Sequence, residues 1–461
     1  MMNAAYREWE FGVMERFLRN KEEVPIDFYL KDDVDCRRCY RCHNQYYADN
    51  DFIIVYLEDI KEPDKKGGKG YSLLLDFFTF SDYTRFAEEI NGVPRGYDDN
   101  NEWKDKYLPR STFFIIENYR ATDKLERGKH YYLNLWNLRN TELKRSPEGQ
   151  NGFPIMGILP LPDVEVNNEN KDATLLYMTM PLTYPQIVFS SLQHNEGYYG
   201  QADLVINMLK VWNVGQGNYN ELLTDNNPYL IYDAGTDVFG NGVAAYKCKL
   251  LDELKNGLPM FVLSHWHADH YSLLFALENN DLRRIQYYLL PSYVKNLSVF
   301  LLVARLILIG ARVDMVKLPF SNKWESIGMK NMTLFANRYD TGSTNDSGLS
   351  LFVKGAKGNA MLPGDCKYSL AEGETNECLK EAEMEKDLCL VIPHHGGKAG
   401  KTVSYNVLGA KALEGIVSVG LNGYGHPKTE VMKMIKKFVP KIRMTMTPED
   451  LNGDDHIFVE L

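Results

Sequence analysis

The sequence lacks several features that would place it in a class at once. It has only seven cysteines in 461 residues, so we expect no disulfide framework and favour a reducing compartment. The opening segment MMNAAYREWEFGVMERF carries acids and aromatics where a signal peptide needs a basic and then an apolar run. The most apolar stretch, Leu297–Gly310, contains Arg305 and is shorter than the roughly twenty residues of a membrane span. We therefore expect a cytoplasmic protein with no membrane partner.

Positive charge is also in short supply. Lys and Arg number 52 against 62 Asp and Glu, which gives a formal net charge of −10 at pH 7. This balance argues against a protein that coats nucleic acid non-specifically, although a local basic rim is still compatible with a nuclease. The chain is 44% hydrophobic and 25% charged, the ordinary balance of a globular protein.

Histidine is scarce too, but its distribution is uneven. Of ten histidines, six lie in three short clusters after residue 260. We predict a domain boundary between an N-terminal domain, 1–197, and a second domain, 198–461. Short apolar runs between turn-rich polar segments predict a strand-rich α+β fold for the first domain, with a helix at 9–19. The predicted strands are Phe52–Tyr56, Tyr71–Phe77, Phe113–Ile116 and Tyr131–Trp136.

After about residue 203, predicted strands and helices alternate, which is typical of an α/β domain. The predicted strands include Leu204–Val211, Tyr229–Asp233, Phe261–Ser264 and Arg284–Leu290, and the predicted helices include His270–Asn279 and 294–310.

The segment His265-Trp266-His267-Ala268-Asp269-His270 joins an apolar run to a predicted helix. Residues two apart in an extended chain point the same way, so His265 and His267 can share one metal ion. Asp269 and His270 lie where the chain turns into the helix and can face a second ion. Imidazole and carboxylate suit zinc, manganese or iron better than magnesium. A histidine-rich surface loop is the alternative, which this density of ligands disfavours.

Three later segments supply further candidate ligands at the ends of apolar runs. Asp365 follows Pro-Gly, and the pair His394-His395 follows Ile-Pro and precedes two glycines. His426 lies between Gly425 and a proline, before a helical segment. Each segment alone is weak or moderate evidence for a metal site, and Gly-Asp, for example, is also common in turns. The three segments together are stronger evidence.

These segments, in this order, resemble the metallo-β-lactamase superfamily. The branch they resemble is the hydrolase domain of the competence protein ComEC and its relatives. The resemblance is carried by Val211–Asn218, Ile231–Gly235, His265–His270, Leu362–Asp365, Pro393–Gly396 and Tyr424–Pro427. The first 200 residues take no part in this resemblance. It implies an α/β fold, a four-layer αβ/βα sandwich with the site at one edge of the two sheets.

The resemblance also implies two divalent metal ions, zinc in the first place, with manganese or iron as alternatives. His265 and His267 would hold one ion, Asp269 and His270 the other, and Asp365 would bridge them. A pair of divalent ions lowers the pKa of water to roughly 7 and so supplies hydroxide at neutral pH. Asp269 would thus be essential for catalysis.

Four further residues complete the implied site. His394 would complete the second ion's ligands, with His395 as the less favoured substitute. Asp233 would orient a ligand histidine. His426 would lie over the site, bind a phosphoryl oxygen or protonate the leaving group, and act as a second catalytic residue.

The sequence departs from the ComEC-like pattern at several points. The superfamily often has a histidine as third ligand of the first ion, and 345–350 has none, as is common in this branch. The third ligand of the first ion could therefore be Asn345, Asp346 or water. Asn218 stands where aspartate is usual, and Gly397 where serine is usual. ComEC also has membrane helices, so DNA transport is not carried over.

Two further motifs remain. Cys36, Cys39, Cys42 and His43 could form a structural zinc site, although we favour reduced thiols, and covalent haem attachment would need export.

The segment 396–402 resembles a phosphate-binding loop but has His395 where that motif needs glycine. Lys398 and Lys401 are candidates for attracting an anionic substrate, or else form a solvated loop.

We predict a metal-dependent hydrolase, a phosphodiesterase or nuclease whose substrate is nucleic acid or a nucleotide. One alternative is a dinuclear hydrolase of a lactone, thioester or other ester, which would use the same metals. Another is a partner-regulated or non-catalytic binding module. The N-terminal domain is a candidate surface for a homo-oligomer or a regulatory protein partner.

Overall fold

The computed structural model describes two parts of the chain. These are 52–63, 70–78, 82–83, 85–86, 111–119, 125–135, 157–160 and 175–177, and then 205–461 with gaps at 240–241, 293, 295, 317, 320–323, 330, 338–342, 382–385, 401–412, 421–424 and 452–453. The predicted helix at 9–19, the cysteine cluster, the predicted boundary after residue 197 and Lys401 lie outside the described residues.

The described N-terminal residues form a six-stranded sheet with the order β5-β3-β2-β1-β4-β6. Its strands are β1 (Phe52–Lys61), β2 (Tyr71–Phe77), β3 (Phe114–Tyr119), β4 (His130–Asn134), β5 (Gly157–Pro160) and β6 (Leu175–Tyr177). Strands β1 to β4 fall on the four apolar runs that predicted strands.

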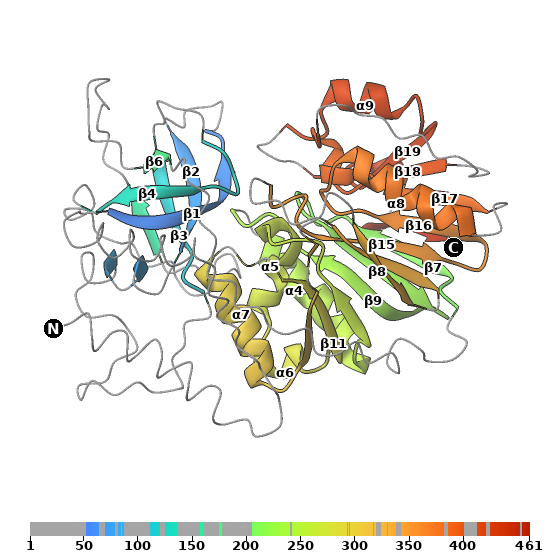
Figure 1. The fold of residues 1–461 in the computed structure, drawn as a ribbon, viewed down its shortest axis with the longest axis horizontal. Coiled ribbons are helices and arrows are strands. Elements are labelled where there is room, and N and C mark those ends of the chain that lie inside the picture. Colours follow the sequence, from blue (N-terminus) through green and yellow to red (C-terminus); the bar gives the residue numbers. More distant parts are fainter. Residues whose placement is uncertain are drawn as a thin grey trace.

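The described residues from 205 onward form two seven-stranded sheets (Figure 1). The first, in the order β12-β11-β10-β9-β8-β7-β20, contains β7 (Met208–Trp212), β8 (Tyr219–Thr224), β9 (Asn227–Ala234), β10 (Met260–Val262), β11 (Tyr287–Pro291), β12 (Arg312–Val316) and β20 (His456–Glu460). The second, in the order β13-β14-β15-β16-β17-β18-β19, contains β13 (Glu325–Met329), β14 (Met332–Ala336), β15 (Leu349–Lys354), β16 (Gly358–Leu362), β17 (Asp387–Val391), β18 (Leu413–Val417) and β19 (Lys441–Met444).

Helices cover the outer face of each sheet. The first sheet is covered by α4 (Gly242–Glu253), α5 (Ala268–Ala276) and α7 (Leu297–Leu308), and the second by α8 (Tyr368–Glu381) and α9 (Thr429–Ile435). Short helices α6 (Asn279–Leu282) and α10 (Pro448–Leu451) lie in connections. In β9, Leu230 and Tyr232 face the second sheet while Ile231 and Ala234 face the helices, so both faces of the strand are apolar. The predicted αβ/βα sandwich is confirmed.

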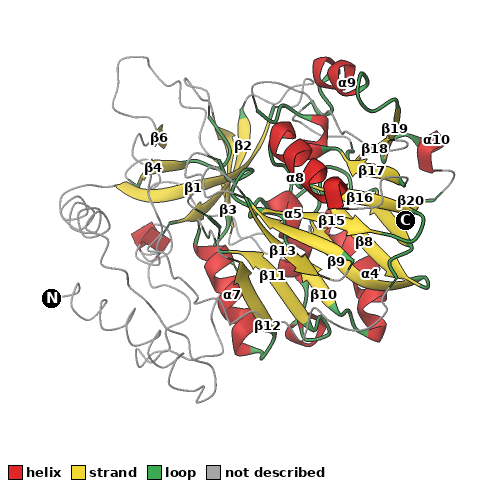
Figure 2. Cartoon of the chain, turned by 45° about the vertical axis from the view of Figure 1, so that its right-hand side comes forward, coloured by secondary structure: helices red, strands yellow, loops and turns green. Residues whose placement is uncertain are grey.

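The N-terminal sheet packs on the helical face of the first sheet. Figures 1 and 2 show α7 next to it. Leu297 and Leu301 of α7 belong to the core of the N-terminal sheet, while Phe113 beside β3 packs edge-on against Phe275 of α5. Among the described residues, no helix has both the length and the apolar character needed to cross a membrane.

Candidate metal centre

The loop between β10 and α5 carries the first ligand candidates. His265 and His267 lie on the extended segment before α5, and His267 precedes the first helical residue with φ −115° and ψ 142°. The helix begins against β9, because a Cβ on Gly235 would lie 1.9 Å from the carbonyl oxygen of Asp269. The absence of a side chain at Gly235 therefore lets Asp269 and His270 approach the end of the strand.

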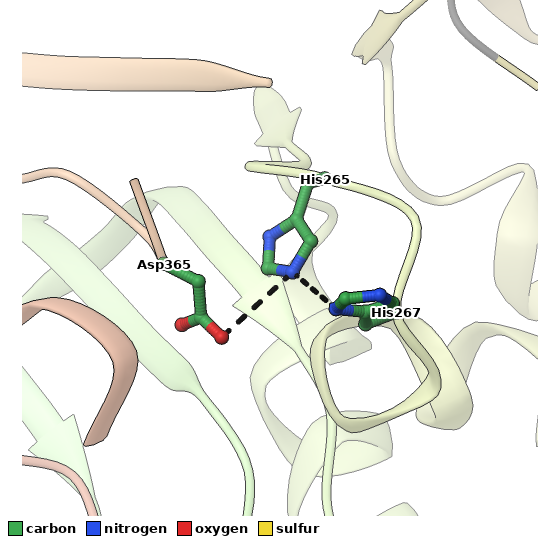
Figure 3. A group of neighbouring side chains, drawn as sticks. All are labelled: His265, His267 and Asp365. Atoms are coloured by element: carbon green, nitrogen blue, oxygen red, sulfur yellow. Dashed lines mark hydrogen bonds and ion pairs between the residues drawn. The ribbon is translucent and has the colours of Figure 1, made fainter. Parts of the chain in front are cut away.

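The first group of ligand candidates consists of His265, His267 and Asp365, whose ligand atoms lie within 4.8 Å of one another. His265 Nε2 is 3.0 Å from His267 Nδ1 and 3.9 Å from Asp365 Oδ2. Figure 3 shows this nitrogen directed at both partners. Burial lowers the pKa of both histidines, which keeps them in the neutral form that binds metal.

The second group consists of Asp269, His270 and His395, also within 4.8 Å of one another. His395 Nε2 lies 3.6 Å from Asp269 Oδ2. Asp365 approaches this group with its other oxygen, Oδ1, which is 3.3 Å from His270 Nε2 and 3.8 Å from His395 Nε2. One carboxylate is thus shared between two groups of buried ligands.

Asp233, at the end of β9, orients His270. Its Oδ2 is 2.8 Å from His270 Nδ1 and accepts hydrogen bonds from Ser264 Oγ and Asn218 Nδ2, each at 2.8 Å. These contacts occupy the inner ring nitrogen of His270 and leave Nε2 facing Asp365. A carboxylate that binds the other ring nitrogen in this way fixes the orientation of a metal-binding histidine.

His394 and His395 occupy a tight turn after β17. Both have left-handed backbone angles, with φ 53° and 50°, which is costly for residues other than glycine and is typical of functional sites. His395 Nδ1 lies 2.7 Å from the carbonyl of Ser418, which leaves its Nε2 facing the second group. His394 Nε2 instead lies 3.9 Å from Asp365 Oδ2, the oxygen nearest His265. The second group therefore contains His395, the alternative left open by the sequence, and not His394.

The residues present fit a pair of metal ions. Among the described side chains, His270 Nε2, His395 Nε2 and Asp365 Oδ2 are buried without a hydrogen-bond partner. Burial by itself would lower the pKa of His270, but the carboxylates of Asp365, Asp233 and Asp269 raise it well above its ordinary value. A buried site with this much negative charge is stabilised by cations. Imidazole and carboxylate ligands suit zinc, manganese and iron alike, so the donor set does not select one metal.

No protein-family model and no curated protein matches the chain. Among solved structures, it is similar to a metal-dependent hydrolase of the β-lactamase superfamily, with 14% identity and a TM-score of 0.35 over 55% of this chain and 99% of that one. It is also similar to the diiron β-hydroxylase CmlA from Streptomyces venezuelae, with 11% identity and a TM-score of 0.32 over 56% and 55%. A third similar structure is a long form of RNase Z from yeast, with 9% identity and a TM-score of 0.24 over 64% and 57%. None of the three points to the ComEC-like branch.

Asn345 and Asp346, two of the three candidates left open as third ligand of the first ion, differ in their surroundings. Asp346 forms an ion pair with Lys367 and also accepts a hydrogen bond from the Lys367 backbone at 3.1 Å. Both described contacts of its carboxylate are thus with Lys367. Asn345 is half-buried, and its Oδ1 has no hydrogen-bond partner among the described residues.

His426 lies beside the ligands rather than among them. Its ring centroid is 5.2 Å from that of His394. Burial, together with the nearby His394, His395 and Lys428, lowers the pKa of His426 to about 3, so the ring is neutral at neutral pH. Lys398 is exposed and paired with Glu430 at 3.1 Å, which fits a solvated loop at least as well as a substrate contact.

The sequence pattern missed Arg127, which belongs to the N-terminal half. Its guanidinium group pairs with both oxygens of Asp269. Burial would raise the pKa of Asp269, but Arg127 and the neighbouring imidazoles hold it well below its ordinary value. No motif surrounds Arg127, so only its position in space identifies it. Ser264 begins the His265–His270 segment, but the sequence pattern gives it no role, whereas its Oγ donates to Asp233 in the structure.

Proposed function

We propose that the protein is a metallo-β-lactamase superfamily hydrolase that cleaves phosphodiesters at a dinuclear metal centre. The observation that carries this proposal is the division of the Asp365 carboxylate. Oδ2 faces His265 and His394, whereas Oδ1 faces His270 and His395. Such a division supports a ligand that bridges two cations, which is the arrangement of two-metal hydrolases.

The same geometry suggests how the ligands are divided. We propose that each ion is held by Asp365 and three further residues, which are His265, His267 and His394 for the first ion and Asp269, His270 and His395 for the second. On this assignment His394 takes the place of the third histidine that residues 345–350 do not provide. Substituting His394 should then weaken the first ion more than the second.

The side chains at the edge of the centre support a phosphodiester substrate. His394 is 22% exposed and His426 is half-buried beside it, with Arg127 nearby on the N-terminal side. A neutral His426 can donate a hydrogen bond to a phosphoryl oxygen, an anionic acceptor that strengthens such a bond. When bound, the two ions would supply hydroxide and offset charge on the phosphoryl group. Nucleic acid or a nucleotide is the proposed substrate class.

The test is hydrolysis of bis(p-nitrophenyl) phosphate with added zinc or manganese. We expect activity in the wild type and in Asp252→Asn, which alters a surface carboxylate paired with Lys255. Asp269→Ala should lose both activity and the second ion. Retained activity in Asp269→Ala would contradict the proposal. A protein that holds two ions but leaves this diester intact would redirect the assignment to lactones or thioesters, which use the same site.

A further inference from the structure

A turn of the N-terminal half reaches the metal centre. Arg127 lies on the segment before β4, 142 positions from Asp269. Its Nη1 donates to Asp269 Oδ2 at 3.3 Å, and its Nη2 forms a shorter contact with Oδ1. The Arg127 side chain is 16% exposed and that of Asp269 only 3%. The pair is therefore an interior contact between the two halves of the molecule.

The N-terminal sheet holds Arg127 from behind. Its Nε donates to the carbonyl oxygen of Glu58 at 3.0 Å and lies 3.6 Å from Asp59 Oδ1. The next residue, Gly128, donates its backbone N–H to Leu57 at 2.8 Å. With Nε engaged by β1, the two terminal nitrogens are directed at Asp269.

The sheet is itself fixed to the helix that carries Asp269. Glu58 is fully buried, and its Oε1 accepts a hydrogen bond from Tyr271 of α5 at 2.8 Å. Its Oε2 accepts one from Asn296, the N-cap of α7, at 3.1 Å. Gly128 lies so near the centre that a Cβ there would be 3.2 Å from His267 Nε2. The position of Arg127 relative to α5 is thus fixed by its own contacts with β1 and by the hydrogen bond from Tyr271 of α5 to Glu58 of β1.

We propose that Arg127 is a positioning residue of the metal centre, which holds the Asp269 carboxylate in the orientation that the second ion requires. In this orientation Oδ1 is 3.8 Å from His270 Nε2 and Oδ2 is 3.6 Å from His395 Nε2. A carboxylate has enough lone pairs to bind an ion and a guanidinium group together. The planar fork of arginine fixes the plane of the carboxylate, which a single ammonium group does not. The inference rests on the proposed dinuclear centre and extends it to the N-terminal half.

The experiment is a titration of the full-length apo-protein with Zn²⁺, followed by calorimetry, and with Co²⁺, followed by its visible absorption. We expect two ions in the wild type. In Arg127→Ala the second ion should bind roughly 10- to 100-fold more weakly, as for other partners of metal ligands, while the first is unchanged. Arg127→Lys should recover part of the loss. Guanidinium ion at low millimolar concentration should restore the second Co²⁺ spectrum of Arg127→Ala, which a merely structural role would not predict.

Glu126→Gln is the matched control, because Glu126 is an exposed residue on the same turn. It should bind both ions as the wild type does. An unchanged second ion in both Arg127 variants would overturn the inference while leaving the proposed function intact. Tighter binding in Arg127→Ala would also overturn it and would show that arginine competes with the metal. A wild type that binds a single ion would contradict the dinuclear centre itself.

Discussion

Gly397 lies against the ring of His426, and a Cβ at this position would come within 2.3 Å of His426 Cε1. Serine, usual here in the ComEC-like pattern, would therefore displace the ring. Asn218, where that pattern has aspartate, donates to Asp233 and accepts a hydrogen bond from Asn220 at 2.8 Å. An aspartate would bring two carboxylates together. Both departures thus match their immediate surroundings in this chain.

His426→Ala should retain both metal ions but lower kcat by about 100-fold, the lower end of the contribution of a proton-transfer or hydrogen-bonding group. Gly397→Ser should have a similar, weaker effect because it moves the same ring. Metal content and kcat measured on the same samples decide whether His426 contacts the substrate or binds a metal ion. If His426→Ala loses a metal ion, His426 is a ligand and the assignment fails.

Glu374 in α8 gives a pH prediction. Burial raises its pKa to about 8, above its ordinary value of 4.5. The folded protein therefore holds more protons than the unfolded chain between these values, and the free energy of unfolding falls as pH rises through this window. Glu374→Gln should remove a slope of up to about 1.4 kcal/mol per pH unit. Denaturant midpoints between about pH 5 and pH 8 measure it, and equal slopes in the two proteins would refute it.

The sequence indicated most of the ligand candidates because they lie in short segments with regular spacing. His265 and His267 are two residues apart, and Asp365 and His394 each follow an apolar strand. The position of His395 beside Asp269 and His270 depends on how the turn after β17 folds, which spacing cannot show. The part that Arg127 plays could not be predicted, because it contacts a residue 142 positions away and no local pattern encodes that contact.

At the scale of elements, apolar periodicity located strands better than it located their ends. The predicted strand 229–233 is observed as β9 over Asn227–Ala234, and the predicted helix 270–279 is observed as α5 over Ala268–Ala276. The helix begins earlier because Asp269 takes part in its first turn, and it ends earlier because Leu277 has an extended backbone. At the N-terminal end, the shift accompanies the close approach of Asp269 and His270 to Gly235.

The contact between β9 and α5 predicts the effect of Gly235→Ala. The new Cβ would meet the backbone of Asp269 at 1.9 Å and His270 N at 2.3 Å, so the start of the helix must move. We expect a loss of about 1–3 kcal/mol in stability and weaker binding of the second ion. Gly328→Ala in β13 is the control, because its Cβ would have no atom within 4 Å. Thermal melts and zinc titrations of both proteins test this, and equal behaviour would contradict it.

At the scale of the molecule, the N-terminal sheet and the sandwich share buried polar contacts. Asp76 Oδ2 accepts a hydrogen bond from the backbone N–H of Ser298 in the first turn of α7 at 2.8 Å, and Thr112 N donates to Ser298 Oγ at 2.7 Å. A carboxylate at this end of a helix is stabilised by the helix dipole. The sequence suggested two units but could not show that their polar groups satisfy one another.

A fragment starting at residue 198 should therefore be less stable than the full chain. Tyr271 and Phe275 would become exposed, at about 1.5–3 kcal/mol for each buried apolar side chain. We expect a lower Tm for the fragment than for the full chain. The fragment should also bind the second metal ion at least as weakly as full-length Arg127→Ala does. That variant is the reference, because it lacks only the arginine. A fragment with the Tm of the full chain would show that the halves are independent.

The pairing of Glu58 with Tyr271 also has a consequence for biosynthesis. The two residues are 213 positions apart, and Tyr56 and Thr344, which approach within 3.3 Å, are 288 apart. At about 5–20 residues per second, Tyr271 follows Glu58 out of the ribosome by roughly 10–40 s. During that interval Glu58 lacks Tyr271 and Asn296, the two side chains that hydrogen-bond its carboxyl group in the folded protein. The two groups of ligand candidates can come together only after His395 has been made.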